Sequence, residues 1–506
     1  MLRRSSHAST RVAFVALVTA VAAQACGSDT TAASNNPPAG FKISVDTNTL
    51  SVVQGTSATK FINVTRTGGF SGDITYTVTG APAGLTVGVT TGAPNTSTLS
   101  VTAAGALPTA DYPIVVAASA TGTTTGTNAD PLTVIVTVKP AVPPAGTPTL
   151  FKSVFAGDAS SCALTATGVA YCWGLNANGQ LGNGETSGIN STPAAVRAGL
   201  TFEELSLPAN GHFACGVATG GDAYCWGAND VGQLGDGTKT QRLVPTPVSG
   251  GLKFLTLSVG ETHVCGVTLD FAAYCWGLNA HGSLGDGTTS PHMTPVAAAP
   301  GMTFKAIAAA SAYTCGLTRE GAAYCWGNGL FGVLGNGSTD DSVNPVPVSG
   351  GLTFTGLAAG GLDICGLTST GAAYCWGRNL YGEVGDGTTT PRSTPVPVAG
   401  GLTFSTIAAG FEHFCGVASE GAAYCWGYNE TGVLGDGTFD HRSSPSPVTG
   451  VFKFQGIAMG NGHSCGVTQP KANGSNDVYC WGANSAGQIG DGTTTPSAGP
   501  FEVFWP

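Results

Sequence analysis

Short apolar runs alternate with glycine- and proline-rich turns along the chain from residue 150 onward. One stretch shows the whole pattern: apolar runs at 351–360, 364–368 and 372–377, a glycine-rich turn at 379–390, and a run with two prolines at 395–398. Runs of this length bounded by turn residues predict β-strands rather than helices. The proline run is expected at the outer edge of a four-stranded sheet, because proline cannot donate a ladder hydrogen bond. The run ending in Ala-Ala-Gly is expected to be the innermost strand.

This four-strand pattern recurs seven times. Each copy contains the motif Tyr-Cys-Trp-Gly, and successive motifs lie 50 to 55 residues apart. Four-stranded units at this period are the signature of a β-propeller. We therefore expect residues 150–506 to form a seven-bladed β-propeller. The sequence leaves open whether residues 501–504 form the outer strand of the last blade or close the first one.

Residues 41–138 have a different texture, with valine, isoleucine and threonine in period-two runs and no cysteine. Such alternation predicts half-buried strands, and about seven of them in a hundred residues predict an immunoglobulin-like β-sandwich. The expected fold class is therefore all-β, a seven-bladed β-propeller preceded by an immunoglobulin-like β-sandwich. Residues 139–149 are proline-rich and predict a semi-rigid linker, and residues 26–40 predict a disordered tether.

The first 25 residues have the features of an export signal. Three arginines precede an uncharged stretch at 12–23, and small residues precede Cys26. The segment Ala-Gln-Ala-Cys at 23–26 resembles the lipobox of bacterial lipoproteins, which implies lipidation of Cys26 and anchoring to the cell envelope. Gly27 after the cysteine would, by the same resemblance, permit the outer membrane. Ordinary cleavage after Ala-x-Ala, giving a secreted protein, is the alternative.

Fourteen of the 15 cysteines form seven pairs, one in each repeat, and Cys26 is the odd one. Paired cysteines in an exported chain favour disulfides. A zinc site is not indicated, because the sequence contains no Cys-x-x-Cys spacing. In one repeat a turn at 319–321 makes Cys315 and Cys325 non-hydrogen-bonded partners, about 4.5 Å apart and within disulfide reach. The predicted bridges are Cys162–Cys172, Cys215–Cys225, Cys265–Cys275, Cys315–Cys325, Cys365–Cys375, Cys415–Cys425 and Cys465–Cys480.

The composition restricts the classes of partner that the chain can bind. Charged residues make up 9% of the chain and its formal net charge is −10. Nucleic-acid binding needs clustered lysine and arginine, so that class is excluded. Apart from the lipid anchor, no second segment is apolar enough to span a membrane.

The repeats resemble the regulator of chromosome condensation repeat family. The resemblance is carried by the Ala-Ala-Gly strand, Cys-Gly-Leu-Thr, Tyr-Cys-Trp-Gly and Asn-x-x-Gly-x-Leu-Gly-Asp-Gly, and it covers residues 150–506. It implies the propeller fold, whereas a fold of this kind hosts unrelated activities. One activity implied by the family's nuclear member is nucleotide exchange on a small GTPase, which we keep as an alternative. An extracytoplasmic hydrolase is a second alternative.

Three motifs resemble catalytic or metal-binding sites but are better explained by structural roles. Gly-His-Ser-Cys-Gly at 462–466 spells a nucleophile elbow, but its serine lies in a predicted strand rather than at a strand-to-helix turn. The Gly-Asp-Gly turns are ordinary turn chemistry rather than calcium ligands. Some repeats have a histidine two residues before a cysteine, but in other repeats the equivalent position holds Ser160, Tyr313 or Asp363. A metal cluster of histidines is therefore not expected. We expect no cofactor, no metal and no catalysis.

Two variable turns of each repeat are expected on the same face of the propeller, because successive strands alternate in direction. They are the turn after the Ala-Ala-Gly strand and the long turn after Tyr-Cys-Trp-Gly. Variable loops that present aromatic residues on a rigid scaffold favour recognition, and drift on an unused surface is the alternative. We therefore expect a monomeric, non-catalytic, envelope-anchored protein that binds a protein or glycan through this face. The candidate binding residues are Glu261, His263, His281, Tyr313, Leu330, Phe331, Asp363, Leu380, Tyr381, Phe411, Glu412, His413, Tyr428 and Glu430.

Overall fold

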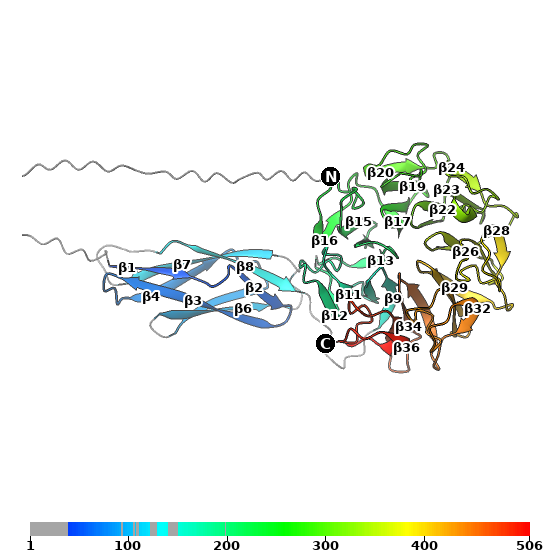
Figure 1. Cartoon of the computed structure of the whole chain (residues 1–506). Coiled ribbons are helices and arrows are strands. Elements are labelled where there is room, and N and C mark those ends of the chain that lie inside the picture. The colour runs from blue at the N-terminus through cyan, green and yellow to red at the C-terminus, as the bar shows by residue number, and fades with distance from the viewer. Residues whose placement is uncertain are drawn as a thin grey trace, which may run out of the picture.

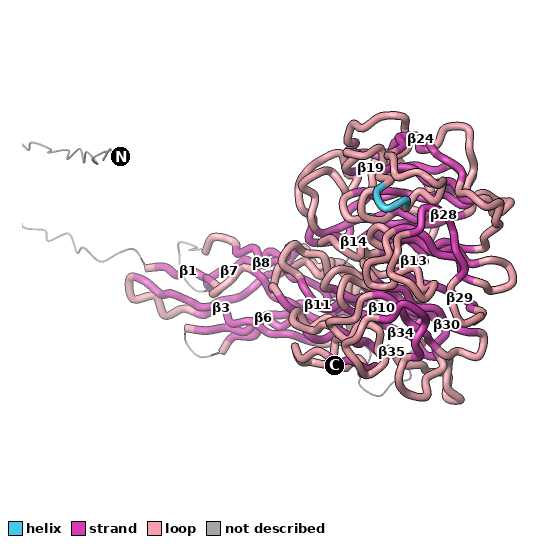
Figure 2. Tube along the Cα trace, turned by 45° about the vertical axis from the view of Figure 1, so that its right-hand side comes forward, coloured by secondary structure: helices cyan, strands magenta, loops and turns pink. Residues whose placement is uncertain are grey.

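The computed structural model describes residues 39–92, 95–104, 107, 111–121, 129–139, 150–197 and 199–505. The export signal, Cys26 and most of the predicted tether and linker lie outside these residues. The chain forms a two-sheet part beside a ring of seven small sheets (Figure 1). Strands and loops make up the fold, with one short 3-10 turn at Leu330–Gly332 (Figure 2). Among the described residues there is no helix with the length and hydropathy needed to cross a bilayer.

The described residues of the two-sheet part form eight strands. One sheet has the order β1-β3-β6-β5 and the other β2-β8-β7-β4, with β2 parallel to β8. Fully buried side chains from both sheets, among them Leu99 of the first and Val134 of the second, share one core, so the two sheets form a β-sandwich. Its assignment as immunoglobulin-like stays a prediction. The strands are β1 Gly40–Ser44, β2 Thr49–Val53, β3 Ser57–Thr67, β4 Asp73–Thr79, β5 Leu85–Thr91, β6 Thr96–Ala103, β7 Asp111–Thr121 and β8 Leu132–Lys139.

The ring consists of seven blades, each built from four consecutive antiparallel strands, so the predicted seven-bladed β-propeller is confirmed. Blades 1 to 3 are β9 Phe151–Ala156, β10 Ser160–Thr165, β11 Ala170–Leu175 and β12 Ile189–Ala195; β13 Phe202–Ser206, β14 Phe213–Ala218, β15 Ala223–Gly227 and β16 Arg242–Pro247; β17 Phe254–Val259, β18 His263–Thr268, β19 Ala273–Gly277 and β20 His292–Ala298.

Blades 4 to 7 repeat the same arrangement, and the 3-10 turn lies in blade 4 after its third strand. They are β21 Ala306–Ala309, β22 Tyr313–Leu317, β23 Ala323–Gly327 and β24 Ser342–Pro347; β25 Gly356–Ala359, β26 Asp363–Leu367, β27 Ala373–Gly377 and β28 Arg392–Pro397; β29 Phe404–Ala409, β30 His413–Ala418, β31 Ala423–Gly427 and β32 Arg442–Pro447; β33 Phe454–Met459, β34 His463–Thr468, β35 Val478–Gly482 and β36 Ser497–Glu502.

The order of strands within a blade agrees with the expectation from proline and alanine. The first strand of every blade lines the axis, and the proline-containing strand is outermost. The question left open at the C-terminus is also answered. Because β36 pairs with β35, residues 501–502 belong to the outer strand of blade 7 and do not close blade 1.

Each blade contains one disulfide between its two middle strands. In blade 4, Cys315 lies opposite Cys325 and Leu317 opposite Ala323, which is the predicted register. The seven bridges join the predicted partners, with Cα atoms 4.0 to 4.1 Å apart. Seven disulfides indicate an oxidising compartment outside the cytoplasm.

The tryptophan of each motif joins its blade to the one before it. Trp326 of blade 4 is fully buried against Leu284 of blade 3, and its indole N–H donates to the Ser283 carbonyl at 2.9 Å. Gly285 has φ +66°, and a Cβ at this position would lie 2.5 Å from the indole nitrogen. The glycine in this turn is therefore required both by its backbone conformation and by the approach of the tryptophan.

A backbone hydrogen bond also crosses six of the seven interfaces. The amide of the phenylalanine that begins, or just precedes, each first strand donates to a carbonyl in the hairpin turn of the preceding blade, as from Phe354 to Gly321 at 2.8 Å. At the seventh interface, where the two ends of the ring meet, the acceptor is a side chain. Asn476 accepts from the Phe151 amide at 2.7 Å and donates to the Phe151 carbonyl at 2.9 Å. Trp505 stacks on Phe151 with ring centroids 4.5 Å apart.

Candidate binding face

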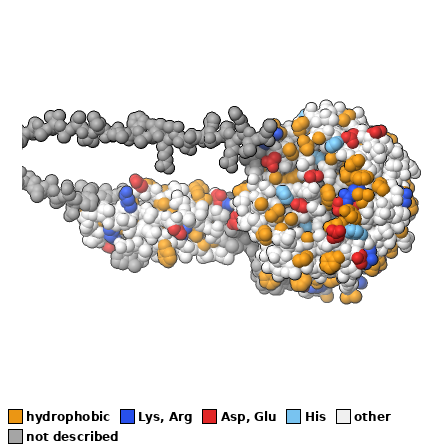
Figure 3. All heavy atoms as spheres, viewed as in Figure 1, with side chains coloured by type: hydrophobic (Ala, Val, Ile, Leu, Met, Phe, Trp, Pro, Cys, Tyr) orange, Lys and Arg blue, Asp and Glu red, His pale blue; other side chains and the backbone are white. Residues whose placement is uncertain are grey.

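The two kinds of variable turn meet at one end of the propeller, which we call the binding face. Arg378, in the long turn of blade 5, forms an ion pair with Glu412, in the turn after the first strand of blade 6. His281 and Asp341, in the long turns of blades 3 and 4, lie 2.8 Å apart. Charged and histidine side chains are scattered among hydrophobic ones on the propeller face seen in Figure 3.

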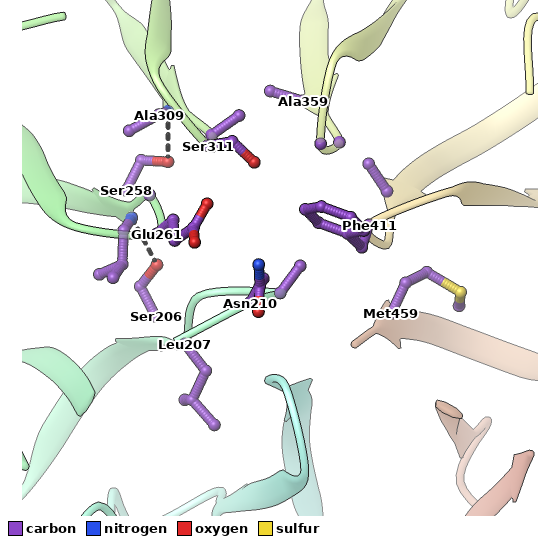
Figure 4. A pocket seen from close by; sticks show the side chains of 17 residues that line it. Ser206, Leu207, Asn210, Ser258, Glu261, Ala309, Ser311, Ala359, Phe411 and Met459 are labelled. Carbon is purple, nitrogen blue, oxygen red and sulfur yellow. Dashed lines mark hydrogen bonds between the residues drawn. The ribbon is translucent and has the colours of Figure 1, made fainter. Parts of the chain in front are cut away.

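A small cavity of about 140 Å³, the axial pocket, lies on this face where the turns after the first strands converge. Four side chains from four different blades point toward its centre: Asn210, Glu261, Ser311 and Phe411 (Figure 4). Glu261 and Phe411 are among the binding residues predicted from the sequence, whereas Asn210 and Ser311 are not. Ser311 lies four residues before a cysteine, as Glu261 and Phe411 do, and this equivalence was the available signal. Asn210 lies five residues before Cys215 in a longer turn, and small polar residues in turns rarely stand out.

Glu261 carries the negative charge of the axial pocket. Burial raises the pKa of Glu261, the Ser311 hydrogen bond opposes that rise, and the nearby negative charge of Asp158 adds to it. Asp158 itself accepts a hydrogen bond from Asn461 at 2.9 Å and lies 3.6 Å from His212. No basic side chain acts on Glu261 in the part of the chain that the structure describes. The carboxylate is therefore partly desolvated and has no internal counter-ion.

A wider channel of about 390 Å³ follows the axis behind this pocket, lined by residues of all seven first strands. Glu204 is the one ionisable side chain among the described residues of its wall. Burial raises the pKa of Glu204 to about 7, against a hydrogen bond from Thr256 and the charge of Lys152. The Thr256 hydroxyl donates to the Glu204 carboxyl at 3.1 Å. This carboxyl changes its protonation near neutral pH.

Blades 5 and 6 carry a second feature of the face, a cluster of Arg378, Glu383, Tyr381, Tyr428 and His441. The Arg378 guanidinium lies 3.1 Å from the buried Glu383 carboxylate and 5.5 Å from the centre of the Tyr381 ring. The Tyr381 ring meets that of Tyr428 edge-on at 5.3 Å and that of His441 at 4.7 Å. Burial raises the pKa of Glu383, and the Arg378 charge opposes the rise. Because its charges and rings are already paired internally, this cluster supports the surface beside the pocket.

Leu330 and Leu380 are the large apolar side chains that this face leaves most exposed among the candidate residues. Their exposed fractions are 49% and 52%. Phe331, next to Leu330, has φ +59°, a conformation that is uncommon for an aromatic residue. Phe331, His281, Tyr428 and Glu430 are partly or largely exposed. These residues remain available for contact with a partner.

The prediction that four of the candidate residues lie on the binding surface is wrong. His263, Tyr313, Asp363 and His413 are at most 1% exposed. The position two residues before the cysteine lies at the start of the second strand, and its side chain is enclosed between blades. A partner outside the propeller therefore cannot reach these side chains.

The buried histidines form hydrogen bonds across blade interfaces. His263 Nε2 lies 2.9 Å from the Thr314 hydroxyl of the next blade, and that hydroxyl donates to the Ser283 carbonyl at 2.9 Å. Because the hydroxyl proton is used in this way, the ring must donate through Nε2. Burial lowers the pKa of His263 to about 4 and that of His413 to about 3. These histidines stabilise the interfaces in their neutral form.

The serine of the apparent nucleophile elbow belongs to the same network. Ser464 lies in β34 and is fully buried. Its hydroxyl donates to the Val433 carbonyl at 2.8 Å and lies 3.2 Å from His413 Nε2. Since the histidine donates to this oxygen rather than removing its proton, the pair does not form an activated nucleophile.

The Gly-Asp-Gly aspartates brace their own turns. Asp236 accepts from the Thr238 amide at 2.9 Å, and its second oxygen pairs with Arg242 at 2.7 Å. Three or more histidine, cysteine, aspartate or glutamate side chains gathered for a metal ion are not found among the described residues.

Comparison with known proteins agrees with this geometry. The description "Regulator of chromosome condensation (RCC1) repeat" matches residues 220–267, 320–362, 370–417 and 420–467, and a second description of that repeat matches residues 151–180 and 404–432. The ultraviolet-B receptor UVR8 of Arabidopsis thaliana is 35% identical over 114 residues, 22% of this chain and 26% of the receptor. The human E3 ubiquitin-protein ligase HERC2 is 37% identical over 106 residues, 20% of this chain and 2% of the ligase.

Two solved structures share the fold of the propeller. Human WBSCR16 superposes with a TM-score of 0.60 at 20% identity, covering 67% of this chain and 95% of that one. Prp20p of Saccharomyces cerevisiae, described with its binding to Gsp1p and histones, has a TM-score of 0.57 at 22% identity, covering 64% and 84%. Repeat matches, seven four-stranded blades and these neighbours lead to one conclusion: the propeller of this chain carries regulator of chromosome condensation repeats.

Proposed function

We propose that this chain is a non-catalytic binding protein that holds a partner on its binding face. The observation that carries the proposal is the axial pocket, in which turns from different blades bring together a carboxylate without a counter-ion and an aromatic ring. Concave sites with a few convergent polar groups on a rigid scaffold are the usual places of recognition. The exposed Leu330 and Leu380 provide apolar surface for the same contact.

The cellular setting belongs to the proposal as well. Seven disulfides agree with export, and the lipobox-like segment supports a lipid anchor at Cys26 on a bacterial envelope. The partner would then be a protein or glycan of the envelope or its surroundings. Binding to Gsp1p and histones is a property of Prp20p, and it supports only the general use of such a propeller for contact with other proteins.

The two alternatives have less support. Hydrolysis would need an accessible nucleophile, but Ser464 of the apparent elbow is buried and donates its proton to a carbonyl. Nucleotide exchange on a GTPase stays a prediction from the family resemblance.

The test compares exposed apolar residues on the two faces. Leu380 is 52% exposed on the binding face, and Leu269, in a hairpin turn at the opposite end, is 55% exposed. The double variant Leu330→Ser/Leu380→Ser and the control Leu269→Ser are used as bait for envelope fractions, beside the wild-type chain. We expect the double variant to lose most of the captured partner, because burying the exposed half of each leucine against a partner contributes about 1 kcal/mol. Equal capture by the double variant and the control would show that the partner binds elsewhere.

A further inference from the structure

We propose that the axial pocket receives one lysine or arginine side chain projecting from a partner protein. The inference rests on the proposed function and names the chemistry of its central contact. Four observations support it: the charge of the pocket, its rigidity, its size and the placement of its aromatic ring.

The charge of the pocket is negative, and its Glu261 carboxylate has no counter-ion among the described residues. Glu261 has no cationic neighbour in the described part of the chain, and Asp158 places a second negative charge near it. Basic side chains on this face are already engaged: His212 lies 3.6 Å from Asp158, Arg378 pairs with two glutamates and His281 pairs with Asp341. A cation entering from outside would therefore find an unpaired carboxylate, whereas an anion would be repelled.

The rim of the pocket is tied together between neighbouring blades. The Glu261 amide donates to the Ala310 carbonyl of the next blade at 3.1 Å, and the Gly361 amide donates to the Phe411 carbonyl at 2.9 Å. The Phe411 amide in turn donates to the Gly460 carbonyl at 3.2 Å. Because these bonds fix the turns that carry the pocket residues, the site is formed before the ligand arrives, which lowers the entropic cost of binding.

The size of the pocket selects the part of the partner that enters. A volume of about 140 Å³ accommodates one side chain but excludes a hairpin or a helix. A long, flexible side chain with a charge at its tip meets this requirement, because its apolar stem can remain at the mouth while the head reaches the carboxylate.

The aromatic ring is placed for such a ligand. Phe411 faces Glu261 across the pocket, and Ser311 and Asn210 lie between them (Figure 4). A cation held near the ring face gains about 0.5–2 kcal/mol, and the hydroxyl and amide oxygens of Ser311 and Asn210 can accept hydrogen bonds from its N–H groups. Met459 and Leu207 also line the pocket and offer apolar contact to the stem. A bare metal ion fits less well, because one carboxylate is a poor cage for it.

The experiment measures binding of two short peptides to the full chain. The probes are acetyl-Gly-Lys-Gly-amide and the same peptide with norleucine, which keeps the stem and lacks the charge. We expect the lysine peptide to bind in about the millimolar range and at least about tenfold more tightly than the norleucine peptide, since tenfold corresponds to about 1.4 kcal/mol. Glu261→Gln should abolish this difference, and Phe411→Leu should weaken lysine binding about two- to fivefold. Glu320→Gln, an exposed glutamate in a hairpin turn of the opposite face, is the control and should change neither affinity.

Several results would overturn the inference. One is equal affinity for the two peptides, another is unchanged lysine binding by the Glu261→Gln variant, and a third is no binding of the lysine peptide at about 10 mM. Its failure is distinguishable from that of the proposed function. If Glu261→Gln still captures the envelope partner while Leu330→Ser/Leu380→Ser does not, the proposed function is supported and the lysine contact is rejected. If both Glu261→Gln and the double variant capture the partner, the proposed function and the lysine contact are both rejected.

Discussion

Asn476 closes the ring, and its replacement by alanine tests whether one side chain can stand in for a backbone group. The residue lies in the loop between β34 and β35, which is five residues longer than in the other copies. Its amide oxygen accepts from the Phe151 amide at 2.7 Å, and its nitrogen donates to the Phe151 and Thr468 carbonyls at 2.9 and 3.2 Å. At the other six interfaces a main-chain carbonyl accepts the corresponding amide hydrogen bond.

The expected loss in the free energy of unfolding follows from the buried groups that the alanine leaves without a hydrogen-bond partner. Asn476 and Phe151 are 4% and 2% exposed, so water cannot readily replace the lost partner. The Phe151 amide becomes a buried donor without an acceptor, which costs about 1–3 kcal/mol, and each further lost hydrogen bond adds about 0.5–1.5 kcal/mol. The Phe151 carbonyl keeps a hydrogen bond from Gln455 at 3.1 Å. We therefore expect Asn476→Ala to lower the free energy of unfolding by about 2–4 kcal/mol.

Two measurements check this value. A loss of that size lowers the Tm of a propeller of about 350 residues by roughly 3–5 °C, and amide hydrogens of β9 should exchange faster than those of other first strands. Asn473→Ala is the matched control, because Asn473 lies in the same loop and, within the described part of the chain, its side chain bonds to Ser475, two residues away. A Tm and β9 exchange equal to those of the control would refute the idea that Asn476 closes the ring.

Three further predictions concern glycine, protonation and the disulfides. Gly285→Ala should cost about 1–3 kcal/mol more than Gly251→Ala in urea unfolding, because both have φ +66° but only the first would place a Cβ 2.5 Å from a neighbouring atom; equal costs would contradict the packing argument. Glu204 has a pKa of about 7 in the folded chain against 4.5 unfolded, so the stability of the wild-type chain relative to Glu204→Gln should fall as pH rises from 4.5 to 7. The variant should unfold like wild type at pH 4 and be about 1–3 kcal/mol more stable at pH 8, and a difference that is the same at both pH values would exclude this carboxyl as the cause. Replacing Cys315 and Cys325 together by alanine should lower the free energy of unfolding by about 2–3 kcal/mol, and an unchanged urea midpoint would show that the bridge does not form.

Local rules were enough to predict the blade. The register of Cys315 with Cys325 follows from the length of one hairpin turn, and the edge position of the proline strand follows from a missing donor. Both depend on residues close together in the chain, where strand geometry leaves few choices. The number of blades follows because the repeat is visible seven times.

Properties that depend on contact between blades could not be predicted in this way. The alternation of side chains along β18 and β30 does not reveal that neighbouring blades cover both faces of each strand. The prediction that His263 and His413 lie on the surface is wrong for this reason. The role of Asn476 depends on Phe151, 325 residues away. The axial pocket needs turns from several blades at once, and Asn210 and Ser311 acquire meaning only when those turns meet.

Every blade is taken from one uninterrupted segment of the chain, with no strand exchanged between the two termini. A genetic event that copies or deletes one unit of about fifty residues therefore leaves all remaining sheets intact and changes only the circumference of the ring. The adaptation that such an event demands falls on a few side chains at the seam, chiefly the partners of Phe151. An architecture of this kind can evolve new ring sizes, and with them new axial openings, by recombination between its own repeats.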